Sequence, residues 1–362
     1  MEREHEAPDA AEWKHFLRQA KAFRKQAPWT DMQGDDLFAV DDPVSGRRLY
    51  ACVLGMDATY YALNVYPDMA GVYGHLALLG MDQDSLIAEQ HIMGQQSIIQ
   101  VEFTSRDALT KEDRAQIKKA GVSFRGRNHW PQTLRYVPGL QPRDVTGEEL
   151  RLLQVVMEQT MDLAERVQAD ELDVAPLYDH ETGDLTLIVR VPTTAKDGSI
   201  AWRDAWERLT LEDTDDEASA VLPFDELRLT RLRRSVLPLQ GEWEVHSGYL
   251  MMPLQPEPGD DLDRPFLPHV QAIVDRDSGT VLHMSVCKPA KAAETLHAEI
   301  LNVIEAAGMA PKAFAVQTAE ARAAVTTVAD TFGLTINYGR PLTRTEQVLT
   351  EIVELERSGG FP

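Results

Sequence analysis

One short motif, Asp-x-x-Ser/Thr-Gly, occurs three times in the chain and joins two apolar runs each time. Its copies occupy residues 42–46, 179–183 and 275–279. The Asp and Ser/Thr side chains of such a motif hydrogen-bond to nearby backbone groups, and glycine readily adopts a positive φ. Each copy therefore predicts a β-hairpin turn. Because helical patterns follow the hairpins, the chain is predicted to consist of mixed sheet-and-helix units.

Length and charge limit the classes of function. The chain has 362 residues, of which 43% are hydrophobic and 26% are charged, as is ordinary for globular proteins. This length predicts two or three domains. The net charge of -22 is unusually negative. Because it repels polyanions at long range, a role with nucleic acid is not expected unless a local basic patch provides it.

Several features of the sequence indicate the cellular compartment of the protein. Residues 1–11 are polar and lack the apolar core of a signal peptide. No run reaches the roughly 18 apolar residues of a membrane span. Cys52 and Cys287 lie in separate apolar runs without a second ligand at metal spacing, so both are expected to be buried, reduced thiols. We therefore expect a cytoplasmic protein that has no contact with a membrane.

The pattern of apolar residues divides the chain into three parts. We expect an N-terminal module over residues 1–168, a C-terminal module over 239–362, and between them a small unit, 169–238, that is either separate or an extension of the first module. In the first module, Thr146 and Glu149 have capping-box spacing, which predicts the start of a helix. The proline-rich stretch 125–143 is expected to be an irregular loop.

Two further expectations concern the second and third parts of the chain. Trp202 and Trp206 are spaced four apart, which is compatible with a short helix or a wide loop. The C-terminal module shows the element order β-β-β-α-β-α-β-α. The predicted fold class is therefore α+β or α/β, with mixed sheets, β-hairpins and flanking helices.

The C-terminal third resembles the ribonuclease H-like cores of integrases and transposases. The resemblance lies in the order of elements and in two stretches, residues 272–282 and 307–312. In that family, two acidic residues on strands and one on the last helix bind two divalent metals for phosphoryl transfer. A neutral residue, Gln317, follows the fourth strand, where the second acid should lie. The resemblance therefore implies a degenerate core without metal.

A second resemblance covers almost the whole chain. Trp29, residues 37–43, residues 125–131 and Pro138-Gly139 are similar to an uncharacterised family of bacterial cytoplasmic proteins. Some relatives carry a short zinc-binding Cys/His tail similar to SEC-C motifs. Here the sequence ends at residues 359–362 without such a tail, so no zinc is expected. The resemblance implies a fold and no particular activity.

The best candidate for a binding site is the stretch 122–143, which contains no Asp or Glu. Guanidinium groups bind phosphate or carboxylate in bidentate geometry, and aromatic rings stack on flat ligands. The candidate anion-binding residues are Arg125, Arg127, His129, Trp130, Arg135 and Tyr136. An alternative interpretation is that these arginines pair with carboxylates elsewhere in the chain while the aromatic residues hold the loop.

The common short sequence motifs of enzymes are absent from the chain. There is no Walker loop, dinucleotide fingerprint or nucleophile elbow, and no pair of histidines has metal-ligand spacing. We therefore expect a non-catalytic protein without a cofactor, which binds a small anion or a protein partner. Two alternatives remain open. One is a divalent-metal nuclease or phosphoryl-transfer enzyme that uses Glu244, Asp275 and Glu351; the other is an acidic mimic of nucleic acid.

Overall fold

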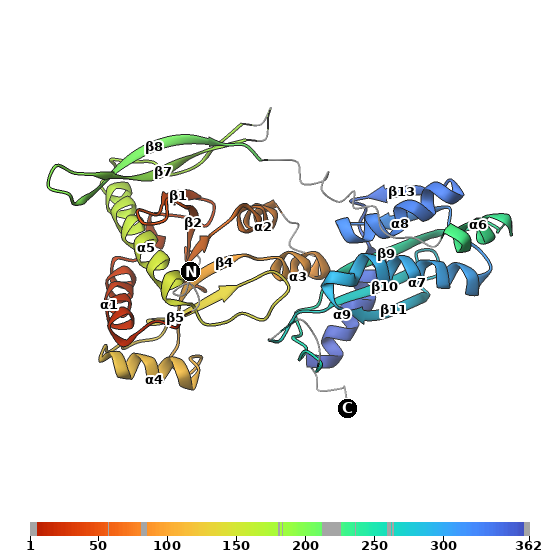
Figure 1. The fold of residues 1–362 in the computed structure, drawn as a ribbon, viewed down its shortest axis with the longest axis horizontal. Helices are drawn as coiled ribbons and strands as arrows, with labels where there is room; N and C mark the ends of the chain where they lie inside the picture. Colours follow the sequence, from red (N-terminus) through yellow and green to blue (C-terminus); the bar gives the residue numbers. More distant parts are fainter. Residues whose placement is uncertain are drawn as a thin grey trace. The chain divides into compact units, whose positions relative to one another are not determined.

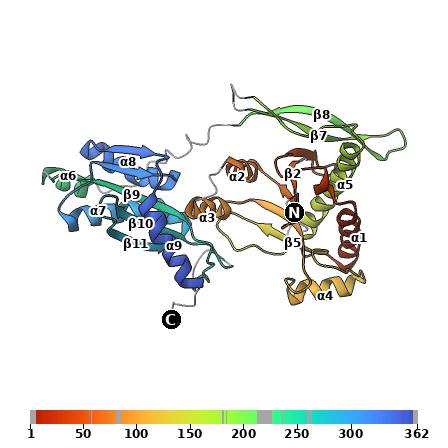
Figure 2. The same cartoon turned by 180° about the vertical axis from the view of Figure 1, so that it is seen from behind.

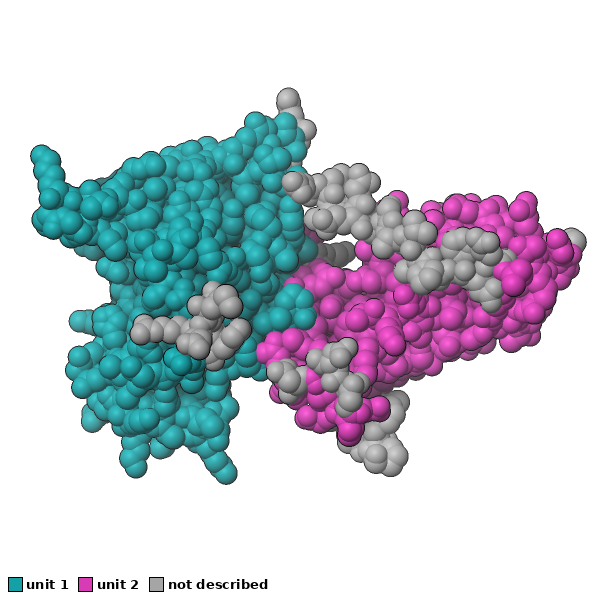
Figure 3. Space-filling view, viewed as in Figure 1, with its two compact units in different colours: residues 1–79, 96–138, 142–212 teal, residues 80–95, 139–141, 213–362 magenta. Residues whose placement is uncertain are grey.

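The structure, a computed structural model, describes residues 6–56, 58–80, 85–179, 182, 184–211, 226–235, 237–258, 262 and 264–357. The chain divides into two compact units, which are coloured separately in Figure 3. Unit 1 contains residues 1–79, 96–138 and 142–212, and unit 2 contains residues 80–95, 139–141 and 213–362. Within the described ranges, no helix is both long and apolar enough to span a bilayer.

Unit 1 is built on one mixed sheet, whose described strands follow the order β5-β4-β3-β2-β1-β7-β6, with β8 paired to β7. Neighbouring strands are antiparallel except for β1 and β7, which run parallel. Both cartoon views show β8 lying outside β7 (Figures 1 and 2). The strands are β1 (Phe38–Asp41), β2 (Arg48–Leu54), β3 (Ala62–Tyr66), β4 (Ile98–Thr104), β5 (Trp130–Tyr136), β6 (Leu177–Tyr178), β7 (Leu185–Thr194) and β8 (Ile200–Leu209).

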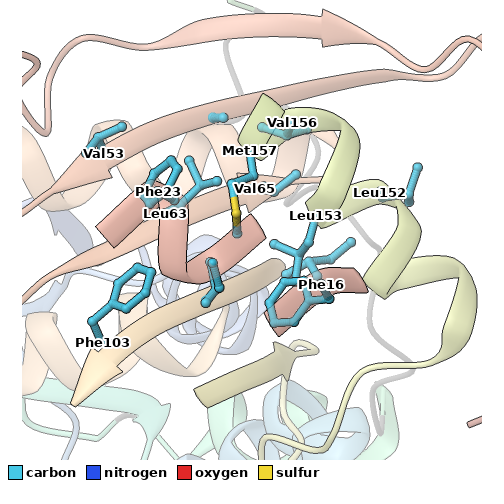
Figure 4. Packing of buried hydrophobic residues seen from close by; sticks show 14 of the residues in the cluster. Phe16, Phe23, Val53, Leu63, Val65, Phe103, Leu152, Leu153, Val156 and Met157 are labelled. Atoms are coloured by element: carbon cyan, nitrogen blue, oxygen red, sulfur yellow. The ribbon is translucent and has the colours of Figure 1, made fainter. Parts of the chain in front are cut away.

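Helices pack against this sheet through buried apolar residues. The helices of unit 1 are α1 (Ala10–Gln26), α2 (Met69–Gly80), α4 (Lys111–Ala120) and α5 (Gly147–Gln168), and the short 3-10 helix η2 (Pro28–Thr30) follows α1. Helices α1 and α5 pack together against the sheet. Phe16 and Phe23 of α1 and Leu153 and Met157 of α5 meet strand residues such as Leu63 in one core (Figure 4). Burial of this apolar surface is the main force that stabilises unit 1.

Unit 2 contains a second mixed sheet, with the order β11-β10-β9-β12-β13. Strands β9, β10 and β11 are antiparallel, while β12 runs parallel to β9 and to β13. The strands are β9 (Glu242–Tyr249), β10 (His269–Asp275), β11 (Val281–Cys287), β12 (Ala313–Val316) and β13 (Thr335–Tyr338). The helices are α3 (Leu86–Gly94), α6 (Glu226–Arg234), η4 (Pro289–Lys291), α7 (Ala292–Ala307), α8 (Ala319–Phe332) and α9 (Thr343–Arg357). The predicted element order of this module is confirmed, and its topology is compatible with a ribonuclease H-like fold.

Helix α3 was not predicted, and it packs on unit 2 although it comes from the N-terminal part of the chain. The hydroxyl of Ser85 donates a hydrogen bond of 3.0 Å to Glu346 of α9, and the same carboxylate accepts one of 3.3 Å from the backbone of Ile87. At its other end, Gly94 lies against the ring of Tyr249 on β9. Both ends of α3 are therefore attached to unit 2 by specific contacts.

The three predicted hairpin turns join β1 to β2, β6 to β7 and β10 to β11. In the first turn, Ser45 donates its backbone N–H to the carboxylate of Asp42 at 2.9 Å, and Gly46 has a φ of +71°. The third turn repeats this arrangement with Asp275, Ser278 and Gly279. The second turn is described only in part, since residues 180, 181 and 183 lie outside the described residues.

Two local expectations are wrong. Residues 125–143 are not wholly irregular, because β5 occupies Trp130–Tyr136 and pairs with β4 along its whole length. Trp202 and Trp206 lie on strand β8 rather than on a helix or in a loop. In both cases pairing with a neighbouring strand outweighs the local signal: β5 pairs with β4, about 30 residues earlier, and β8 forms a hairpin with β7.

The two cysteines are free and lie in different units. Cys52 is fully buried beneath α2, where burial raises the pKa of its thiol to about 12. Cys287 is half-buried, and burial raises the pKa of its thiol to about 11. Because the thiolate is the nucleophile, both cysteines are poorly reactive at neutral pH.

Candidate functional site

A pocket of about 470 Å³ lies in unit 1 between the last turns of α1 and the turn that precedes β5. We call it the basic pocket, because positively charged groups line it and, in the described part of the chain, acidic groups do not. Its walls are formed by Lys21, Arg24, Lys25, Ser123, Phe124, Arg125 and His129. A concentration of positive charge of this kind is unusual in a chain whose net charge is -22.

Helix α1 supplies three of these cations from one face. Lys21, Arg24 and Lys25 have the i, i+3, i+4 spacing that places side chains on the same side of a helix. The opposite face carries Phe16 and Phe23, which are buried in the core of unit 1. Because the negative end of the helix dipole lies at the C-terminus, cations are favourable in these last turns.

The turn 123–129 is held against α1 by two hydrogen bonds to its backbone. Lys21 Nζ donates to the carbonyl of Ser123 at 2.9 Å, and Arg24 Nε donates to the carbonyl of Asn128 at 2.8 Å. Gly126 and Asn128 have φ values of +104° and +56°, which glycine and asparagine tolerate best. A Cβ on Gly126 would lie 3.0 Å from the ring of His129, so the glycine lets that ring approach the turn.

Arg24 contacts two aromatic rings at the edge of the basic pocket. Its guanidinium lies 4.9 Å from the ring centre of Trp29 and 4.6 Å from that of Tyr61. Such cation–π contacts orient the group as well as stabilise it. Burial lowers the pKa of Arg24, but an arginine remains charged at neutral pH. Burial, together with the charge of Arg24, also lowers the pKa of His129, so this imidazole is neutral at pH 7.

Carboxylates of the described residues do not neutralise the cations of the basic pocket. Within the described residues, none of Lys21, Arg24, Lys25 and Arg125 forms an ion pair. Lys25 and Arg125 are also exposed. Their charges are therefore available to a ligand.

The predicted anion-binding residues do not all meet at this pocket. Arg125 and His129 line it, while Arg127 is exposed in the same turn and Trp130 packs beside Phe124 with the rings 5.9 Å apart. Arg135 and Tyr136 lie at the far end of β5, about 20 Å away at 3.3 Å per residue. The structure therefore separates the predicted site into two regions.

The region at the end of β5 has a structural role. Arg135 and Arg143 exchange backbone hydrogen bonds of 2.7 and 3.1 Å, and both guanidinium groups contact Glu149 of α5. Glu149 also accepts the backbone N–H of Thr146 at 2.8 Å, which completes the predicted capping box. Although burial acts in the opposite direction, the hydrogen bonds from Arg143 and Thr146 lower the pKa of Glu149. These two arginines thus pair with a carboxylate inside the protein.

Two stretches of the chain match models of known protein families. Residues 13–185 match the family described as Domain of unknown function (DUF7309), and residues 228–353 match Domain of unknown function (DUF6930). We call residues 13–185 the DUF7309 domain and residues 228–353 the DUF6930 domain, after the family models that they match. The expected resemblance to a family without known activity is thereby confirmed. No curated protein matches the chain.

The basic pocket lies entirely within the DUF7309 domain. The same family match includes α3, although this helix packs with the DUF6930 domain in unit 2. The limits of the sequence family therefore differ from those of the compact units. The two differ because a family match covers a continuous stretch of sequence, whereas a compact unit groups residues that are in contact in space.

In the DUF6930 domain, the three carboxylates of the nuclease alternative have different surroundings. Glu244 is 0% exposed and accepts hydrogen bonds from the backbone of Arg344 and Thr345, at 2.9 and 2.8 Å, so it caps α9. Asp275 accepts hydrogen bonds within its own hairpin turn. Glu351 is exposed on α9. No group of three or more His, Cys, Asp or Glu among the described side chains is arranged to hold a metal ion.

Sequence reasoning missed the three cations of α1. The i, i+3, i+4 spacing of Lys21, Arg24 and Lys25 is the signal in the sequence that points to them. That signal gains meaning only when α1 is known to pack beside residues 123–129, which are about a hundred positions later in the chain.

Proposed function

We propose that the DUF7309 domain is a non-catalytic module that binds a small phosphorylated molecule in the basic pocket. The observation that carries the proposal is the set of four cations that line one pocket without a carboxylate partner among the described residues. Guanidinium and ammonium groups are the side chains that recognise phosphate most often.

The size of the pocket supports a small-molecule ligand. Its volume of about 470 Å³ falls in the range of about 300–1,000 Å³ that is usual for ligand sites. A nucleoside monophosphate is of suitable size. Its phosphate would meet Lys25 and Arg125, and its remaining part would reach the wall that contains Phe124 and His129.

The roles of the cations differ. Lys21 and Arg24 already donate to the backbone of the turn 123–129 and so maintain the shape of the pocket. Lys25 and Arg125 are exposed and make no such contact in the described part of the chain. These two residues are therefore the ones to change in a binding experiment, because their replacement leaves the fold intact.

Isothermal titration calorimetry with AMP, inorganic phosphate and adenosine tests this proposal. We expect AMP and phosphate to bind at low ionic strength, adenosine to bind at least tenfold more weakly than AMP, and binding to weaken as salt screens the charges. The charge reversals Lys25→Glu and Arg125→Glu should each lower the affinity for AMP at least tenfold.

The matched control is Lys14→Glu. Lys14 is exposed on the same helix but does not line the pocket, and the 11 positions between it and Lys25 correspond to about 16 Å along the axis. This variant changes net charge as much as Lys25→Glu and should alter the affinity by less than threefold. The proposal is wrong if the wild-type protein binds neither AMP nor phosphate, or if all three variants behave alike. Binding of an acidic peptide but not of AMP would instead identify a protein partner.

A further inference from the structure

Unit 2 contains a second pocket, of a different chemical character. It has a volume of about 210 Å³ and is bounded by α3, β9–β11 and α9. Most of its walls are aliphatic side chains or methionine, including Ile87, Leu250, Val270, Met284, Leu349 and Ile352. Among the side chains that the structure describes, no Lys, Arg, Asp or Glu lines it. The pocket is therefore suited to a neutral, mainly apolar molecule.

One fully buried polar side chain forms part of the wall. His246 of β9 is 2% exposed, and its Nδ1 has no hydrogen-bond partner among the residues that the structure describes. Burial, together with the neighbouring His91 and His269, lowers the pKa of His246 to about 3. The imidazole is therefore neutral at pH 7. One of its ring nitrogens can donate a hydrogen bond, and the other can accept one.

An unpaired buried ring nitrogen is unfavourable, because it has lost its hydrogen bond to water without replacement. A ligand that carries a hydroxyl or N–H group would provide that replacement. Besides His246, the described residues of the wall with side chains that can form hydrogen bonds are Gln90, Tyr249 and Ser285. The hydroxyl of Ser285 already pairs with Nε2 of His283 at 3.0 Å.

The volume limits the size of the ligand. A dry apolar cavity of about 150 Å³ accommodates benzene. A cavity of about 210 Å³ therefore accommodates one ring with a small substituent. Larger cofactors, such as nucleotides, are too big and too polar for it.

We propose that this pocket is a binding site for a small, neutral, ring-sized apolar molecule that carries a single hydroxyl or N–H group, and that His246 is its hydrogen-bond partner. The site is independent of the basic pocket, since all its lining residues belong to unit 2. If one of the two proposals is wrong, the other is unaffected.

The probes are p-cresol and toluene, which have nearly the same shape and differ by one hydroxyl group. Toluene is the more hydrophobic of the two, so an apolar cavity without a polar partner would prefer it, because the hydroxyl of p-cresol would be buried without a hydrogen bond. If His246 accepts a hydrogen bond from that hydroxyl, p-cresol binds at least threefold more tightly than toluene. Ligand-observed NMR titration of the full chain measures both affinities.

Two variants of β11 locate the binding. Val286 lines the pocket and is 52% exposed, whereas Val281 is 41% exposed on the same strand and does not line it. We expect Val286→Trp to lower the affinity for p-cresol at least tenfold and Val281→Trp to change it less than twofold. A thermal melt of each variant shows whether it is folded. The proposal is overturned if p-cresol does not bind saturably to the wild-type protein, if Val286→Trp leaves the affinity unchanged, or if toluene binds more tightly than p-cresol.

Discussion

The carboxylate of Asp42, in the turn between β1 and β2, accepts two hydrogen bonds from the guanidinium of Arg151 on α5, at 2.7 and 2.8 Å. Asp42 is 0% exposed, and it also accepts the backbone N–H of Ser45. One residue of the repeated turn motif therefore joins the sheet of unit 1 to the helix that covers it. The equivalent residue of the third turn, Asp275, has no such ion pair among the described residues.

We expect Asp42→Asn to lower the free energy of unfolding by about 1–3 kcal/mol, because Arg151 then loses one of its two acidic partners and a buried charge pair is broken. Asp275→Asn, in the matching turn, should cost less than about 1 kcal/mol, since an asparagine can still form the turn. Urea denaturation of both variants measures the two values. Equal losses would show that the ion pair with Arg151 adds nothing to the turn.

The same variant tests a pH dependence. Although burial acts in the opposite direction, the hydrogen bonds from Arg151 and Ser45 hold the pKa of Asp42 well below its ordinary value. The carboxylate therefore stabilises the folded state fully above the unfolded-state pKa of roughly 3.9, and this stabilisation is lost as the pH falls through the lower folded-state pKa. The difference between wild type and Asp42→Asn should be constant from pH 5 to 7 and shrink below pH 4.

Glu244→Gln should destabilise unit 2 by about 2–4 kcal/mol. The carboxylate is fully buried, caps α9 and forms an ion pair of 3.0 Å with Arg276, which an amide cannot replace. Glu351→Gln, an exposed change on α9, is the control and should stay within about 0.5 kcal/mol. A nuclease site would give the opposite sign, because removing one of several clustered catalytic charges commonly stabilises an enzyme. Chemical denaturation of both variants decides between these outcomes.

Gly94→Ala should loosen the attachment of α3 to unit 2. A Cβ at this position would lie 2.2 Å from the ring of Tyr249, so either the ring or the helix has to move, at a cost of about 1–3 kcal/mol. Gly80→Ala, at the end of α2, meets no atom within 4 Å and should be neutral or slightly stabilising. Hydrogen exchange measured by mass spectrometry should show faster exchange in residues 85–95 of the first variant only. Unchanged exchange there would contradict the close contact.

Acidification should weaken unit 2 through its buried histidines. Burial is the main reason why the pKa values of His246 and His269 fall to about 3 and about 4. The unfolded chain binds protons below pH 6.5, whereas these folded imidazoles stay neutral, so stability falls as the pH is lowered from 6.5 towards 4. Each histidine contributes a slope of at most about 1.4 kcal/mol per pH unit, which it approaches in the middle of this window.

The variant His269→Gln isolates this contribution. It should reduce the slope of unfolding free energy against pH by about 1 kcal/mol per unit between pH 4.5 and 6, while the exposed control His15→Gln should leave the slope unchanged. The free energies come from hydrogen exchange of β9 and β10 at several pH values. A slope identical to that of wild type would show that His269 is solvated and titrates normally.

Local features of this protein were predictable from its sequence, because they depend on residues within a few positions of each other. The Asp42–Ser45 and Asp275–Ser278 turns, the Thr146–Glu149 capping box and the element order of the C-terminal module are of this kind. Each is a short-range hydrogen bond or a periodic apolar pattern, and both can be recognised without knowing the partner strand.

Only the tertiary structure decided which distant segments meet. It placed β7 parallel to β1, attached α3 to Tyr249 and Glu346, and brought Lys25 to Arg125 while Arg135 turned to Glu149. Such contacts are selected by the burial and charge pairing of residues far apart in the chain. The sequence alone therefore determined the turns, the capping box and the element order of the C-terminal module. The folded chain determined which arginines pair with carboxylates, because an ion pair forms only when packing brings its two partners within reach.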